Sequence, residues 1–128
     1  MPSYVLVAIG GALGSVARFW CSGLVARLAG ETFPWGTMAV NVVGSLIIGF
    51  AAALSAPEGR FLVPPEARTF VMVGFCGGYT TFSSFSLQTF ALMQEGEFLW
   101  AAGNIVLSVL LCLVGVWLGY LAGASLNA

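Results

Sequence analysis

Apolar residues fill four long stretches of this chain, and the few charged residues fall between or beside them. The stretches without Asp, Glu, Lys or Arg span residues 1–17, 32–57, 69–94 and 98–128. Each approaches or exceeds the roughly 20 apolar residues that a membrane-spanning helix requires. The pattern predicts an all-α membrane protein, one domain over residues 1–128, with four transmembrane helices at roughly 4–28, 34–55, 67–94 and 98–124.

The third stretch has a composition unlike that of a plain lipid-spanning helix. Residues 74–89 read GFCGGYTTFSSFSLQT, with three glycines and eight side chains that carry a hydroxyl or an amide. Glycine weakens a helix, and backbone freed at membrane depth is tolerated only where protein or a water-filled path surrounds it. We therefore expect the function to be located in this segment.

Composition and charge argue against several classes of protein. The chain is 59% hydrophobic and 7% charged, far from the balance of a soluble domain. Its net charge of −1 offers no clustered basic face for nucleic acid. It contains no His, Asp or Lys, which removes His-based triads, Lys Schiff bases and most metal sites. We therefore expect no enzyme activity.

The arginines give little information about orientation in the membrane. With four crossings, both termini and the loop at 56–66 share one side, which carries Arg60 and Arg68, whereas the other side carries Arg27. Such a small excess is a weak positive-inside signal. The chain is therefore expected to insert in both orientations and to be able to pair with its own inverted copy.

Polar residues recur at helical spacing on three of the predicted helices. They are Ser15, Arg18 and Ser22 on the first, Thr37, Asn41 and Ser45 on the second, and Asn104, Ser108 and Cys112 on the fourth. Residues three or four apart line one side of a helix. One such stripe would be explained by hydrogen bonds between helices. Three stripes beside a hydroxyl-rich third helix favour a shared polar path.

The chemistry of this path favours an anion. Hydroxyls and amides donate hydrogen bonds, whereas a cation path would use acidic rings or carbonyls, and no acid lies deep in any predicted span. Arg18 is the only charge well inside a span, so it is a functional candidate, with snorkelling to the interface as the alternative. Phe82 and Phe85, beside the hydroxyls of Thr81 and Ser84, offer positive ring edges to an anion or serve packing alone.

Three segments resemble the Fluc (CrcB) fluoride channels: GGALGSVARFW at 10–20, PWGTMAVNVVGS at 34–45 and GFCGGYTTFSSFS at 74–86. The resemblance implies a multi-pass protein of the bacterial inner membrane that exports fluoride passively. It also implies an antiparallel, dual-topology homodimer with two fluoride pores at its interface. In that family the third helix is broken near the glycine pair.

The resemblance also implies roles for single residues. Backbone carbonyls of Gly77 and Thr80 from each chain are expected to hold a structural Na⁺ at the dimer interface. The expected pore residues are Phe82, Phe85, Asn41, Ser108, Asn104, Thr37, Thr81 and Ser84, with Arg18 in the vestibule. This chain departs from some relatives at Gln88, where they carry Glu, and at Asn104, where they carry Tyr.

Two other functions fit parts of the pattern. A small dual-topology four-helix exporter of drugs or guanidinium compounds would carry a membrane-embedded Glu in its first helix, and residues 1–17 contain no acid. A membrane subunit that only binds partners would need the glycine motifs alone. That function would leave the polar stripes unexplained.

Overall fold

The computed structural model describes residues 2–128, which form helices and no strand. Three long helices are α1 (Ser3–Ala29), α2 (Trp35–Leu54) and α6 (Phe98–Leu126), all long and apolar enough to cross a membrane. The third crossing consists of α3 (Pro65–Arg68), the π-helix η1 (Thr69–Phe75), α4 (Cys76–Tyr79) and α5 (Phe82–Gln94). The all-helical architecture predicted from the sequence is confirmed, and its bounds differ from the expected ones by a few residues.

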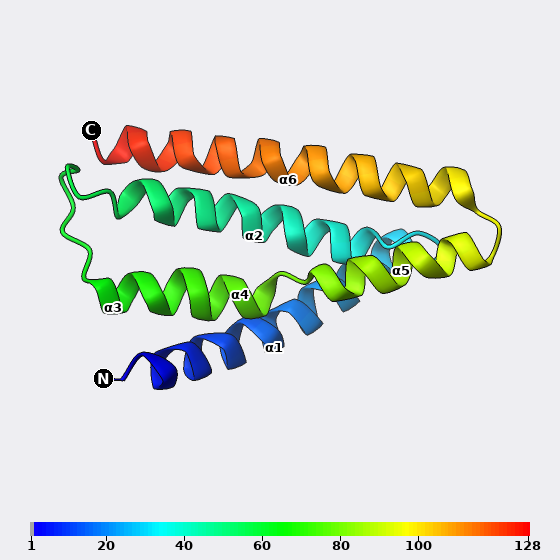
Figure 1. Cartoon of the computed structure of the whole chain (residues 1–128), viewed down its shortest axis with the longest axis horizontal. Helices are drawn as coiled ribbons and strands as arrows, with labels where there is room; N and C mark the ends of the chain where they lie inside the picture. Colours follow the sequence, from blue (N-terminus) through cyan, green and yellow to red (C-terminus); the bar gives the residue numbers. More distant parts are fainter. Residues whose placement is uncertain (1) are drawn as a thin grey trace.

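The four crossings run back and forth along the long axis of the molecule. Figure 1 shows α6, α2 and the third crossing arranged beside one another, while α1 crosses obliquely and passes close to the middle of the third crossing. The start of α1 and the end of α6 lie at the same end as the loop between α2 and α3 (Figure 1). The connections α1–α2 and α5–α6 lie at the opposite end.

The third crossing is interrupted between α4 and α5, as expected. Thr80 has φ −86° and ψ 158°, and Thr81 has φ −151° and ψ 115°, so both residues are extended. The interruption follows the glycine pair Gly77–Gly78 directly. It divides the crossing into two half-helices whose ends face each other inside the bundle (Figure 1).

Glycines let the helix backbones approach closely. A Cβ atom on Gly119 of α6 would overlap the backbone carbonyl of Leu46 in α2, and one on Gly14 of α1 would overlap the carbonyl of Phe75 in η1. Small residues at such crossings are the usual means of helix association in lipid. This close packing fixes α1 against the third crossing and α6 against α2.

The π-helical segment was not predicted from the sequence. The backbone N–H of Cys76 donates to the carbonyl of Val71, five residues earlier. This wider spacing changes which residues before and after η1 face the same side, and π-helical turns are frequent near functional sites. Helical spacing alone therefore does not place the residues upstream of the interruption.

The side chain of Asn127 connects the end of α6 to the end of α2 and to the loop that follows α2. Asn127 Nδ2 donates to the carbonyl of Ala53 at 3.0 Å, and the N–H of Phe61 donates to Asn127 Oδ1 at 3.0 Å. The buried amide thus caps the end of α2 and holds the following loop. The sequence pattern did not single out this residue.

Candidate functional site

The interruption at Thr80 and Thr81 places two helix ends at the middle of a membrane crossing. Carbonyls at the end of α4 carry a partial negative charge, and N–H groups at the start of α5 carry a partial positive charge. Thr81 caps α5, because its Oγ1 accepts the N–H of Ser84 at 3.1 Å. Thr80 caps α4, because its hydroxyl and its N–H both donate to the carbonyl of Cys76, at 2.8 and 3.0 Å.

Asn41 of α2 holds the extended backbone in place. Its Nδ2 donates to the carbonyl of Thr81 at 3.0 Å, and its Oδ1 accepts the N–H of Thr81 at 2.7 Å. The amide side chain therefore pairs with the extended residue as a neighbouring β-strand would. A primary amide has two N–H donors, so the second remains available for another partner.

Arg18 of α1 bonds to the same interruption from the other side. Its Nε donates to the carbonyl of Gly78 at 3.0 Å. A cation near the end of a helix is favourable, and a charged donor strengthens the hydrogen bond. The guanidinium is therefore turned toward the middle of the third crossing, which is not the arrangement expected of an arginine that snorkels to the membrane surface.

Several carbonyls of the interruption remain for another ligand. Within residues 2–128, the bonds at this point use the carbonyls of Cys76, Gly78 and Thr81 and leave out those of Gly77, Tyr79 and Thr80. Gly77 is exposed, and a Cβ built on it would meet no atom within 4 Å. The carbonyls of Gly77 and Thr80 are the two that the resemblance implies for Na⁺, and their open surroundings fit a cation held by backbone oxygens.

A cavity of about 360 Å³, here called the central cavity, opens beside the interruption. Its lining includes seven of the residues expected from the sequence: Asn41, Gly77, Thr80, Thr81, Phe82, Phe85 and Ser108. The rings of Phe82 and Phe85 lie 5.4 Å apart between centroids and are tilted by 43°. Phe82 is 77% exposed in the single chain, so this side of the cavity is open.

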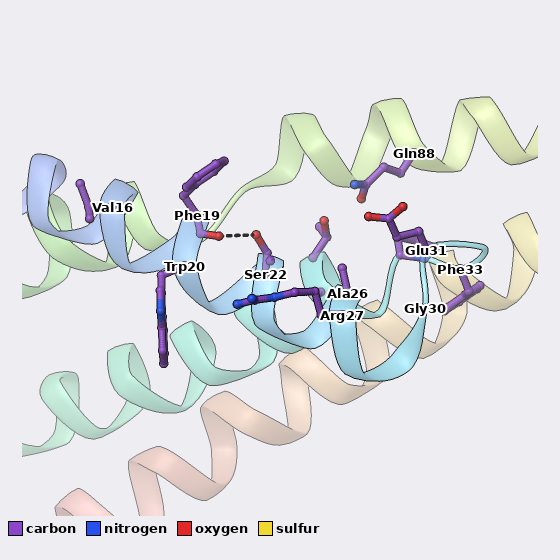
Figure 2. A pocket seen from close by; sticks show the side chains of 14 residues that line it. Val16, Phe19, Trp20, Ser22, Ala26, Arg27, Gly30, Glu31, Phe33 and Gln88 are labelled. Atoms are coloured by element: carbon purple, nitrogen blue, oxygen red, sulfur yellow. Dashed lines mark hydrogen bonds between the residues drawn. The ribbon is translucent and has the colours of Figure 1, made fainter.

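A second cavity of about 740 Å³, here called the end cavity, lies between the end of α1, the start of α2 and α5 (Figure 2). Thr37, Arg27 and Glu31 line it. Figure 2 shows Gln88 pointing into it from α5, and Gln88 Oε1 is buried with no hydrogen-bond partner among residues 2–128. Arg18, expected in the vestibule, does not line this cavity.

The cationic side chain at the end cavity is Arg27, which sequence reasoning had used only to judge orientation. Its position at the end of the first apolar stretch, beside the stripe that contains Ser22, was the available signal. Figure 2 shows Ser22 and Arg27 on the same wall of the cavity.

Two expected pore residues line neither cavity. Ser84 uses its N–H in the cap of α5, and Asn104 of α6 is only 1% exposed. Asn104 Nδ2 donates to Thr89 Oγ1 at 2.8 Å, and the Ser108 hydroxyl donates to Asn104 Oδ1 at 3.1 Å. Asn104 therefore reaches the central cavity only through Ser108. Thr89 belongs to the same group of side chains, and the sequence pattern did not single it out.

Comparison with known proteins finds relatives along almost the whole chain. Residues 5–120 match the family model described as CrcB-like protein, Camphor Resistance (CrcB). A protein of Rhodospirillum rubrum named fluoride-specific ion channel FluC is 58% identical over 125 residues, covering 98% of this chain and 97% of the relative. A protein of Opitutus terrae with the same name is 62% identical over 128 residues, covering 100% of this chain and 97% of the relative.

The match covers all four crossings, including the interruption of the third and the residues of both cavities. Together with the helices that are long and apolar enough to span a membrane, it identifies a multi-pass membrane protein. The chain belongs to the CrcB family.

Proposed function

We propose that this chain forms a fluoride-selective channel that lets fluoride leave the cell passively. The observation that carries the proposal is the central cavity, whose lining combines amide and hydroxyl donors with two phenylalanine rings and contains no carboxylate. Relatives that are 58% and 62% identical are named fluoride-specific ion channels.

The lining of the central cavity suits a small, strongly hydrated anion. Such an ion needs hydrogen-bond donors to replace its water, at sites weak enough to release it again. Asn41 retains an N–H beyond its pair with Thr81. Ser108 places a hydroxyl in the lining, whose hydrogen donates to Asn104 in this structure and would have to turn to reach the ion. Phe82 and Phe85 add the positive edges of their rings, which attract an anion without binding it tightly.

An exporter of organic cations fits the cavity less well. Such a transporter would place a carboxylate where the substrate binds, and the residues that line the central cavity include neither Asp nor Glu. Glu31 lies in the end cavity instead.

We also propose that two chains pair in opposite orientations, with a pore at each side of their interface. The open side of the central cavity supports a second copy, because a fluoride path bounded by lipid would leave the donors facing hydrocarbon. The near-balance of arginines between the two ends supports the antiparallel arrangement.

A Na⁺ ion at the interface would be held by the carbonyls of Gly77 and Thr80 from both chains. Interrupted helices commonly present unwound carbonyls and helix C-terminal ends to Na⁺. The ion would supply positive charge that joins the two interruptions, while the carbonyls of Cys76, Gly78 and Thr81 are already paired within each chain.

The function is tested with purified protein in liposomes loaded with either fluoride or chloride. We expect rapid efflux of fluoride and retention of chloride, measured with ion-selective electrodes. Empty liposomes give the background leak. Equal release of both ions, or no release from vesicles that contain folded protein, would contradict the proposal.

Replacing either ring, by Phe82→Ile or Phe85→Ile, should lower fluoride efflux by about tenfold or more, since each ~1.4 kcal/mol added to a barrier slows passage tenfold. Isoleucine keeps apolar bulk but has no positive edge. Phe90→Ile on the exposed side of the same helix, outside both cavities, is the matched control. The size-exclusion elution volume, which reports whether the dimer still forms, should be compared for all variants. If both pore variants conduct like the wild type, the rings serve packing only.

Na⁺ should stabilise the folded protein. Replacing Na⁺ by N-methylglucamine should lower the midpoint of thermal unfolding, because a ligand at 100 times its Kd contributes about 2.7 kcal/mol. Thr80→Ser should behave like the wild type, since the proposed ligand is the main-chain oxygen. An unfolding midpoint and a fluoride efflux that are both indifferent to Na⁺ would exclude this site.

Orientation should be mixed in the membrane. A tag on the C-terminus, tested with an impermeant reagent on each side, should give two populations of similar size because the arginine bias is weak. Adding two lysines to the loop at 56–63 should shift the population to one orientation and reduce efflux. A single orientation in the unmodified protein, together with a parallel dimer, would refute the antiparallel arrangement.

A further inference from the structure

A buried chain of hydrogen bonds leads away from the central cavity. The Ser108 hydroxyl donates to Asn104 Oδ1 at 3.1 Å, Asn104 Nδ2 donates to Thr89 Oγ1 at 2.8 Å, and the Thr89 hydroxyl donates to the carbonyl of Phe85 at 2.7 Å. Ser108, Asn104 and Thr89 are 5%, 1% and 5% exposed. Of these three residues, only Ser108 lines the cavity.

The Thr89 hydroxyl sets the direction in which these hydrogen bonds run. A hydroxyl has one hydrogen to donate and two lone pairs with which to accept. Because the Thr89 hydrogen points to Phe85, Asn104 must face Thr89 with its NH₂ group and Ser108 with its carbonyl oxygen. Ser108 then donates its only hydrogen to Asn104. In this arrangement Ser108 offers lone pairs to the cavity, which is the wrong polarity for an anion.

The direction of these hydrogen bonds can reverse while the helices stay in place. If the Thr89 hydrogen turns to Asn104 Oδ1 and the amide rotates, Asn104 Nδ2 donates to Ser108, whose hydrogen becomes free to point into the cavity. The carbonyl of Phe85 keeps its partner in α5, because the N–H of Thr89 bonds to it in a regular helix.

An anion at Ser108 favours the reversed arrangement. Without an anion, the reversed arrangement has one hydrogen bond fewer than the observed arrangement, because the Ser108 hydrogen has no acceptor. With an anion, the number of bonds is equal. If Ser108 turned alone, Asn104 Oδ1 would stay buried without a partner, which is unfavourable.

We propose that Thr89 is a positioning residue of the pore, which sets the orientation of the Asn104 amide and lets Ser108 donate to a passing anion. The inference rests on the proposed function, since the anion is the fluoride that crosses the central cavity. Thr89 and Asn104 act through Ser108 and do not touch the ion. Their role is distinct from that of residues in the cavity wall.

The test compares efflux per folded protein for Thr89→Val and Thr89→Ser. Valine has a similar shape but no hydroxyl, so it should lower fluoride efflux about fivefold or more, the factor expected for one lost hydrogen bond. Thr89→Ser keeps the hydroxyl, so its fluoride efflux should equal that of the wild type. Ser55→Ala is the matched control: the Ser55 hydroxyl makes the same kind of bond, to the carbonyl of Ala51 at 2.7 Å, but far from the cavity. It should leave efflux unchanged.

A double-mutant comparison separates positioning from stability. In a Ser108→Ala background, Thr89→Val should change efflux little further, because no hydroxyl remains to be turned. An equal decrease in both backgrounds, or wild-type efflux in Thr89→Val, would overturn the inference. If the valine variant does not fold, Thr89→Cys, with a weakly bonding thiol of similar size, must show the same dependence on Ser108.

The two proposals fail in different ways. If the unmodified protein releases no fluoride, the proposed function is wrong and the role of Thr89 falls with it. If the unmodified protein conducts and the Thr89→Val variant conducts equally well, only the inference about Thr89 is wrong.

Discussion

The structure depends on how the backbone freed at the interruption of the third crossing is satisfied. At membrane depth, no water compensates an unpaired N–H or carbonyl, so each such group must bond to protein or to an ion. The side chain of Asn41 pairs with both backbone groups of Thr81, and Arg18 takes the carbonyl of Gly78. Two neighbouring helices therefore hold the interruption open, and its unused carbonyls and N–H groups become available for function.

Close packing of the helices makes these bonds possible. An asparagine side chain is short, so α2 must lie near the extended backbone for the Asn41 amide to reach Thr81. Glycines provide this approach: a Cβ on Gly44 of α2 would overlap the side chain of Thr80, and one on Gly78 would lie 2.5 Å from the carbonyl of Gly11 in α1. The glycine motifs and the polar stripes, which looked separate in the sequence, thus serve one arrangement.

The sequence was informative about the crossings and less so about individual side chains. Apolar stretches and the glycine pair are local features, so they predicted four crossings and a weak third helix directly. Burial depends on neighbours that spacing does not describe. Asn104 and Ser108 are one helical turn apart on the same stripe, yet Ser108 lines the central cavity and Asn104 lies behind it. Thr89 and Arg27 were missed for the same reason, since their surroundings depend on which helix faces them.

The proposed path through the central cavity is lined by neutral groups, and positive charge lies beside it. A guanidinium in the central cavity would attract fluoride strongly and slow its release, whereas conduction requires sites that bind weakly. Arg18 is the charge closest to the interruption, but its Nε is bonded to the carbonyl of Gly78 and the residue does not line the central cavity. Its charge can favour the presence of an anion nearby without forming a tight site. In the proposed pore, hydroxyl, amide and ring-edge contacts would then carry the ion through the cavity, because each of them is weak enough to be exchanged for the next.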